Sequence, residues 1–127
     1  MSGSQKKITA GIKYYSMLQK GDIVIIRFPF ADAAQYKKRP ALVISNNKVN
    51  QTGDYLMVQI TSKDKSDPLS MPIEITDYTD NKELPLKSFI RLHKIFLLNQ
   101  SLVISKITSV KPGFLENVTG KIIELIK

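Results

Sequence analysis

The sequence predicts a mainly β protein, built as a small and strongly bent sheet or barrel with one C-terminal helix. Five or six short runs of β-branched and aromatic residues are separated by turn-forming Asn, Asp, Gly, Pro and Ser. The last segment changes to the apolar spacing of a helix. With 127 residues, 43% of them hydrophobic, the chain is long enough for one domain with its own core.

The expected strands follow from these runs in chain order. Residues 22–30 carry apolar side chains at successive positions, which indicates burial on both faces, and Pro29 predicts that pairing ends or bulges there. Residues 47–53 favour a turn, and residues 77–87 carry too many turn formers to be regular. The other expected strands are residues 39–46, 54–61, 71–76, 88–98 and 101–110.

Residues 111–127 predict the helix. Gly120 costs it roughly 1 kcal/mol relative to Ala. The apolar residues at helical spacing are Phe114, Leu115, Val118, Ile122, Leu125 and Ile126. We expect this stripe to pack on the sheet.

The formal net charge of +8 suggests an anionic partner such as nucleic acid, with general basic solubility as the alternative. Residues 1–20 hold four lysines and no acid, which leaves 15 cations against 11 acids, or +4, in the remainder. About half of the excess therefore precedes the first strand. We expect residues 1–19 to be a tail or short helix and residues 20–127 to form the domain.

Composition also narrows the function classes. Cysteine is absent and there is one histidine, so a disulfide framework and a thiolate metal site are excluded, and we expect no metal and no cofactor. No apolar run approaches the ~18 residues of a membrane span, and the start lacks a signal-peptide core. The expectation is a cytoplasmic protein that does not contact the membrane.

Alternation along the strands indicates which side chains share a face. Arg39 shares one with Ala41 and Val43, and Gln59 shares one with Thr61. Along residues 88–98, Phe89, Arg91, His93 and Ile95 are expected on one face and Ile90, Leu92 and Phe96 on the other.

Each polar residue also has an ordinary structural explanation. Arg39 fits a solvated strand edge, Thr61 a common strand residue, and Lys37 and Lys38 a charged loop. A single histidine on a strand is unremarkable. The spacing of residues alone predicts a basic β-rich domain and does not decide its function.

The ordered motifs "KGDIVIIRFPF", "KKRPALVISNN", "DYLMVQITSK" and "LPLKSFIRLHKIFLLNQSLVISKITSV" resemble the MazF/PemK family of toxin–antitoxin ribonucleases, from Lys20 to the C-terminal helix. The resemblance implies a small SH3-like β-barrel of the MazF, Kid and CcdB type, as a homodimer. It implies sequence-selective, metal-independent cleavage of single-stranded mRNA in a groove shared by the two chains. It also implies a cognate antitoxin that occupies this groove and relieves growth inhibition, with operator DNA bound only through the antitoxin.

The resemblance places the catalytic residues at Arg39, Thr61, Arg91 and His93. The arginine before proline is Arg39, and the threonine of "ITS" is Thr61. Arg91 matches a second arginine, and His93 stands where some relatives carry an acid, so the acid–base assignment is open. The segment "ADAAQYKK" lacks the Gly and Glu common before "RP", so the cleavage motif does not transfer.

Metal-free cleavage of RNA uses the 2′-OH as nucleophile and needs proton transfer together with charge stabilisation at phosphorus. The planar fork of Arg39 suits the phosphate, Thr61 can donate a hydroxyl proton, and Arg91 is a second cation. His93 is the natural proton-transfer candidate. We expect Lys37, Lys38, Ser62 and Lys63 to bind RNA.

Two other classes stay open at this stage. A non-catalytic member of the same fold would bind RNA or poison gyrase as CcdB does. A basic SH3-like protein-interaction module would bind no RNA.

Overall fold

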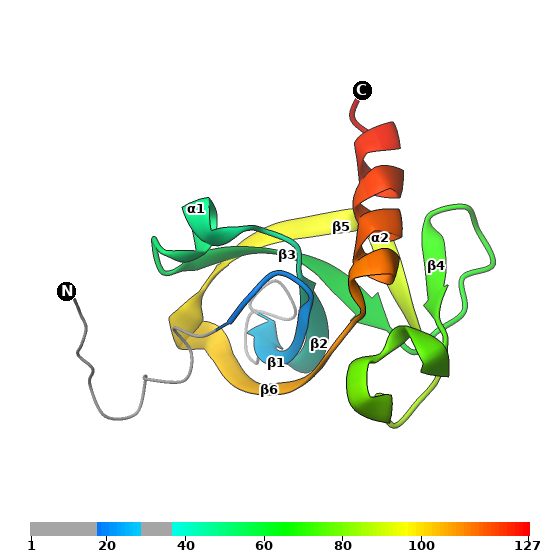
Figure 1. Ribbon diagram of the computed structural model, residues 1–127, viewed down its shortest axis with the longest axis horizontal. Coiled ribbons are helices and arrows are strands. Elements are labelled where there is room, and N and C mark those ends of the chain that lie inside the picture. Colours follow the sequence, from blue (N-terminus) through cyan, green and yellow to red (C-terminus); the bar gives the residue numbers. More distant parts are fainter. Residues whose placement is uncertain (1–17, 29–36) are drawn as a thin grey trace.

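Six strands form one antiparallel sheet in the part of the chain that the computed structural model describes, residues 18–28 and 37–127 (Figure 1). The strand order is β4-β5-β3-β2-β1-β6. The strands are β1 (Asp22–Phe28), β2 (Lys37–Val43), β3 (Asp54–Thr61), β4 (Ser70–Ile73), β5 (Ser88–Asn99) and β6 (Val103–Ser109). The helices are α1 (Asn47–Asn50) and α2 (Pro112–Glu124), with 3₁₀ turns η2 (Ile75–Asp77), η3 (Thr79–Asn81) and η4 (Gln100–Leu102).

The mainly β architecture with a C-terminal helix confirms the predicted fold class. The sheet is open, because β4 and β6 are its outer strands and do not pair with each other. A bridge between Tyr78 and Val110, beside a 2.9 Å hydrogen bond from Lys111 N to Asp77 O, links the segments that follow these two strands. The strongly bent sheet is therefore partly closed through its connecting segments.

Element boundaries differ from the predictions where local hydrogen bonds compete with pairing. Strand β3 has the predicted bounds, whereas β2 begins at Lys37 and ends at Val43. The Asn46 side chain accepts a 2.9 Å bond from Lys48 N and so caps α1, where only a turn was expected. Residues 1–17 of the expected tail at 1–19, and the predicted end of pairing at Pro29, lie outside the described residues. Leu18, within the expected tail, is instead buried in a hydrophobic cluster with residues of β1 and β2.

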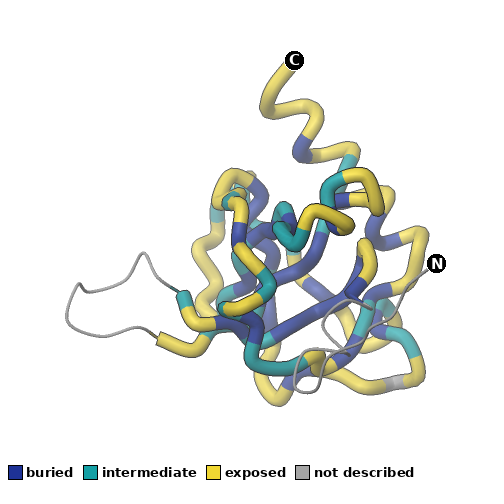
Figure 2. Tube along the Cα trace, turned by 90° about the vertical axis from the view of Figure 1, so that its left-hand side faces the viewer, coloured by how far each residue is buried: buried dark blue, intermediate teal, exposed yellow. Residues whose placement is uncertain are grey.

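Two hydrophobic clusters bury both faces of the central strands. Ile23 of β1 belongs to the cluster that includes α2, and its neighbour Val24 belongs to the other. Leu42 and Val43 of β2 divide in the same way. This confirms the predicted two-sided burial of the first strand, and Figure 2 shows the buried segments running through the middle of the molecule.

Helix α2 packs on the sheet through Phe114, Leu115, Val118 and Ile122, as its spacing predicts. The prediction fails for the end of the stripe. Leu125 and Ile126 follow the last helical residue and are 46% and 75% exposed, at the free end of the chain (Figures 1 and 2).

Strand β5 contains the irregularity that matters most for function. Val58 of β3 pairs with Ile95 and Ile60 pairs with Ile90, so residues 91–94 of β5 bulge out opposite Gln59 alone. The predicted alternation over residues 89–96 is therefore wrong. Arg91 and Leu92 are both buried, and the three residues that follow them are exposed.

Candidate functional site

A groove of about 620 Å³ lies where the ends of β2 and β3 meet the bulge of β5. Its walls come from β1, β2, β3, the β3–β4 loop, the segment before β5 and β5 itself. Six of the lining residues are cationic: Lys38, Arg39, Lys63, Lys65, Arg91 and Lys94. No carboxylate is among the described residues that line it, so the groove carries a concentrated positive charge.

Arg39 and Thr61 both line this groove. Pairing between β2 and β3 runs from Val43–Met57 to Ala41–Gln59 and stops before it reaches either residue. Arg39 continues to pair with Ile26 of β1. The groove therefore lies where regular β2–β3 pairing ends.

The Arg39 guanidinium is held by an aromatic pair. Its central carbon lies 5.6 Å from the Phe28 ring centroid, and Phe28 packs edge-on against Phe96 at 5.5 Å. The Nε atom is buried and has no hydrogen-bond partner among the described residues. An unsatisfied buried donor costs free energy, and a movement of the side chain that brought this N–H to a ligand oxygen would relieve the cost.

Thr61 has a hydroxyl ready to donate. Its Oγ1 accepts a 3.1 Å bond from Lys63 N, which fixes the start of the β3–β4 loop and leaves the hydroxyl proton available. Ser62, Lys63 and Lys65 continue the groove wall along this loop.

Arg91 enters the groove from the bulge of β5 and is itself paired. Its Nη1 lies 2.9 Å from Asp67 Oδ1, and the residue is only 7% exposed. The hydrogen bond from Arg91 lowers the pKa of the Asp67 carboxyl, and the bond from Leu69 N and the nearby charge of His93 act in the same direction.

The groove brings together Arg39, Thr61, Arg91, Lys38, Ser62 and Lys63 of the residues that the sequence singles out. Lys37 and His93 are exposed and do not line it. Lys37 is the first residue of β2, and the lining begins with the next residue, Lys38. His93 lies within the bulge, which breaks the alternation that was expected to align it with Arg91.

Sequence reasoning missed Lys65, Lys94 and Asp67. Lys65 stands two residues after Lys63, and this spacing in an extended segment was the available signal. Lys94 enters through the bulge, and Asp67 meets Arg91 across 24 positions of sequence. Neither contact has a local sequence signature.

The described residues contain no group of three or more His, Asp or Glu side chains that could hold a metal ion. Within the same residues, no helix has the length and apolar character to cross a membrane.

The protein is thus a small mainly β domain with a strongly bent antiparallel sheet and a C-terminal helix. A cationic groove lies at the ends of its central strands. Residues 19–126 match the family described as PemK-like, MazF-like toxin of type II toxin–antitoxin systems, and the chain belongs to this family. The sequence resemblance is confirmed. Comparison with curated proteins finds no match.

Solved structures share the fold. An endoribonuclease from a Mycobacterial species in complex with its cognate antitoxin is 18% identical, with a TM-score of 0.67 over 84% of this chain and 92% of that one. MazF from Deinococcus radiodurans is 22% identical, with a TM-score of 0.66 over 85% and 94%. The Mycobacterium tuberculosis toxin MazF-mt6 is 14% identical, with a TM-score of 0.63 over 82% and 93%.

Proposed function

We propose that this protein is an endoribonuclease toxin that cuts single-stranded mRNA in the cationic groove, with sequence selectivity and without a metal. The observation that carries the proposal is that Arg39 and Thr61 line one groove in which Arg39 is among six cations. Family membership and structural neighbours named as endoribonucleases support it.

The charge of the groove suits the RNA backbone. Lys38, Lys63, Lys65 and Lys94 surround the two arginines, and no described lining residue offers a carboxylate to repel phosphate. Neutralising phosphates with such cations releases counterions, so binding is expected to weaken steeply with salt. The lysines attract RNA of any sequence, and the arginines act at the phosphate to be cut.

The reaction that fits these residues is attack by the RNA's own 2′-oxygen. A bond forms between this oxygen and phosphorus, and the bond from phosphorus to the 5′-oxygen breaks. The 2′-OH gives up its proton and the departing 5′-oxygen receives one, so the products carry a 2′,3′-cyclic phosphate and a 5′-OH.

Arg39 stabilises the charge that develops on the non-bridging oxygens. Its guanidinium lies over Phe28, and its buried Nε–H has no hydrogen-bond partner among the described residues, so a phosphate oxygen that reaches it would satisfy an unpaired donor. Thr61 donates its hydroxyl proton to a non-bridging oxygen from the other side of the groove. Arg91 adds a second cation.

His93 is the proposed proton-transfer group, because histidine is the side chain whose ordinary pKa suits this task near neutrality. It lies outside the groove lining, beyond the Arg91–Asp67 pair. RNA would reach it by extending past that pair along β5.

The groove's own charge supports a mechanism without metal. A divalent cation would enter a site lined by six cations and, among the described residues, by no carboxylate, which is unfavourable. The arginines supply the positive charge that a metal would otherwise provide.

The partners follow from the family. We propose a homodimer whose two chains share the RNA groove, and a cognate antitoxin that blocks this groove and relieves growth inhibition. Structures of relatives in complex with an antitoxin support this. Operator DNA would be bound only through the antitoxin.

The test is to mix the purified protein, and an Arg39→Ala variant as control, with a long single-stranded RNA. Discrete cuts by the unaltered protein alone are expected. Salt-dependent binding without cuts would identify a non-catalytic RNA-binding protein. Neither binding nor cuts would favour a protein target, and a gyrase supercoiling assay would then identify a CcdB-like poison.

A further inference from the structure

Arg91 is a buried cation whose position depends on one partner. Its side chain is 9% exposed, and it comes from the bulge of β5, where regular pairing with β3 is interrupted. The hydrogen bond of 2.9 Å from Nη1 to Asp67 Oδ1 is its only ion pair among the described residues. A buried guanidinium without such a partner would be costly and would lose the contact that fixes its orientation.

Asp67 is itself anchored. Its Oδ1 also accepts a 3.0 Å bond from Leu69 N, and its backbone oxygen accepts a 3.2 Å bond from Ser70 N. Ser70 pairs with Arg91 across β4 and β5, and Leu92 N donates to Leu69 O at 2.9 Å. The carboxylate is therefore tied to the same stretch of β5 that carries Arg91.

We propose that Asp67 is a positioning residue that fixes the Arg91 guanidinium toward the groove for cleavage, a role that rests on the proposed function. A guanidinium has five N–H donors in a rigid plane. Asp67 engages Nη1 and so sets the orientation of that plane, while the donors not held by Asp67 can face the phosphate. Arg91 then acts from a fixed position.

Asp67 is expected to favour cleavage through Arg91 but to weaken the binding of RNA. The Asp67 carboxylate offsets part of the positive charge beside the groove, so it weakens the general attraction of RNA. Removing it should lower the rate of the chemical step while leaving binding equal or tighter. A residue needed only for folding would not separate the two quantities in this way.

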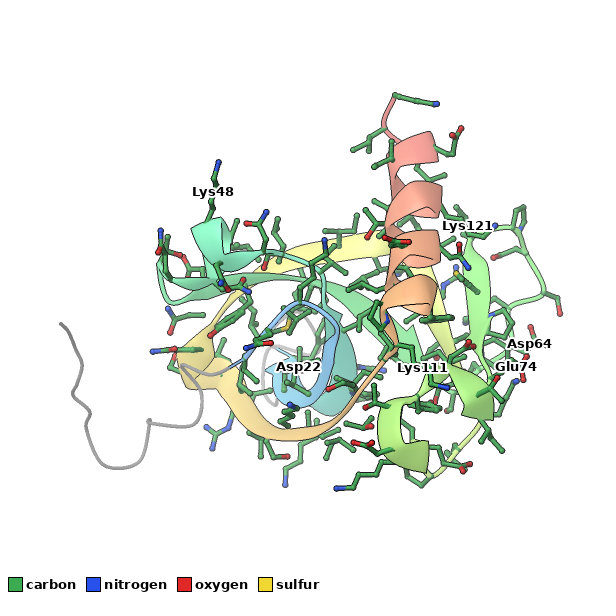
Figure 3. All side chains as sticks on the ribbon, viewed as in Figure 1. Asp22, Lys48, Asp64, Glu74, Lys111 and Lys121 are labelled. Atoms are coloured by element: carbon green, nitrogen blue, oxygen red, sulfur yellow. The ribbon has the colours of Figure 1, made fainter. Side chains whose placement is uncertain are left out.

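Asp64 provides a matched control in the same loop. It carries the same charge, is exposed, and caps its own turn through a 2.9 Å bond from Ser66 N (Figure 3). No contact joins it to Arg91 in the described structure. Asp64→Ala changes the loop's charge by the same amount and leaves the Arg91 pair intact.

The experiment compares Asp67→Ala, Asp67→Asn and Asp64→Ala by single-turnover cleavage of one RNA, and by binding of that RNA with a 2′-deoxy residue at the cut. Asp67→Ala should lower the cleavage rate about 10–100-fold, the scale of a small misplacement of a reacting group. Its binding should be equal or tighter. Asp67→Asn should recover much of the rate, because the amide oxygen can accept from both Arg91 and Leu69 N. Asp64→Ala should cleave at the normal rate.

A cleavage rate for Asp67→Ala within about twofold of that for Asp64→Ala would overturn the positioning role and leave the proposed function standing. A second result would also overturn it: Asp67→Ala lowering the cleavage rate of an Arg91→Gln protein by the same factor as it lowers that of the unaltered protein. A residue that acts through Arg91 should have little further effect once Arg91 is replaced. Absence of cleavage by the unaltered protein would instead overturn the proposed function, and this role with it.

Discussion

Replacing Arg39 with alanine probes the centre of the groove. The change removes a guanidinium that lines the groove together with Thr61 and whose buried Nε–H has no hydrogen-bond partner in the described part of the chain. Preorganised donors of this kind are worth ~3–4 kcal/mol in the transition state. At about 1.4 kcal/mol for each factor of ten, the expected loss in kcat is about 10²–10³-fold.

The fold should survive this change. Arg39→Ala removes a cation–π interaction with Phe28, worth ~0.5–1 kcal/mol at a partly exposed site. It also removes a buried donor that has no partner within residues 18–28 and 37–127, whose cost is ~1–3 kcal/mol, and one of six like charges in the groove. These effects oppose each other, so the free energy of unfolding should change by about 1 kcal/mol or less in urea titration.

The assay is single-turnover cleavage of a fluorescent RNA at saturating protein. Arg39→Lys should restore little of the rate, because an ammonium lacks the planar fork. Lys38→Ala is the matched control, since it removes the adjacent groove cation without touching the proposed chemistry. An Arg39→Ala rate within about threefold of the Lys38→Ala rate would refute the role assigned to Arg39.

Other changes test the surroundings of the groove. Replacing Lys37 and Lys38 with alanine should weaken binding to all RNA sequences, with Lys38 contributing more because it lines the groove. The slope of the logarithm of the binding constant against the logarithm of the salt concentration should also become flatter, by about one unit for each phosphate that a lysine no longer neutralises. A moved cut site would mean that these lysines read bases. His93→Ala should lower turnover by about 10²–10⁴-fold, with partial recovery in His93→Asp. Near-normal turnover with an unchanged pH–rate profile would remove His93 from the chemistry. The hydrogen bond from Arg91 lowers the pKa of Asp67, so the stability that it contributes is present above the ordinary carboxyl pKa of ~3.9 and is lost as pH falls through the lowered value. Urea unfolding between pH 2 and 7 should show a smaller acid loss for Asp67→Asn, and equal losses would contradict this linkage.

The parts of the fold that depend on local pattern were predictable. Strand β3 appears with its predicted bounds, and the helical stripe packs through Phe114, Leu115, Val118 and Ile122. Two-sided burial of β1 followed from its continuous apolar run. These signals lie within one element and need no knowledge of its neighbours.

The candidate site was predictable where strands stay regular. Alternation and the family motifs led to Arg39 and Thr61, and both line the groove at the ends of the paired parts of β2 and β3. Alternation failed on β5, because the bulge opposite Gln59 shifts the register between Ile90 and Ile95. The pairing of Arg91 with Asp67 depends on a loop returning to that bulge, which no local spacing encodes.

The most direct test of the central claim is end-group mapping of one defined RNA after incubation with the purified protein in EDTA. Metal-free attack by the 2′-oxygen predicts discrete cuts whose upstream fragments end in a 2′,3′-cyclic phosphate. It also predicts no cut where a 2′-deoxy residue replaces the attacking nucleotide. Cleavage that disappears in EDTA and returns with magnesium, or fragments that end in a 3′-OH, would contradict the mechanism.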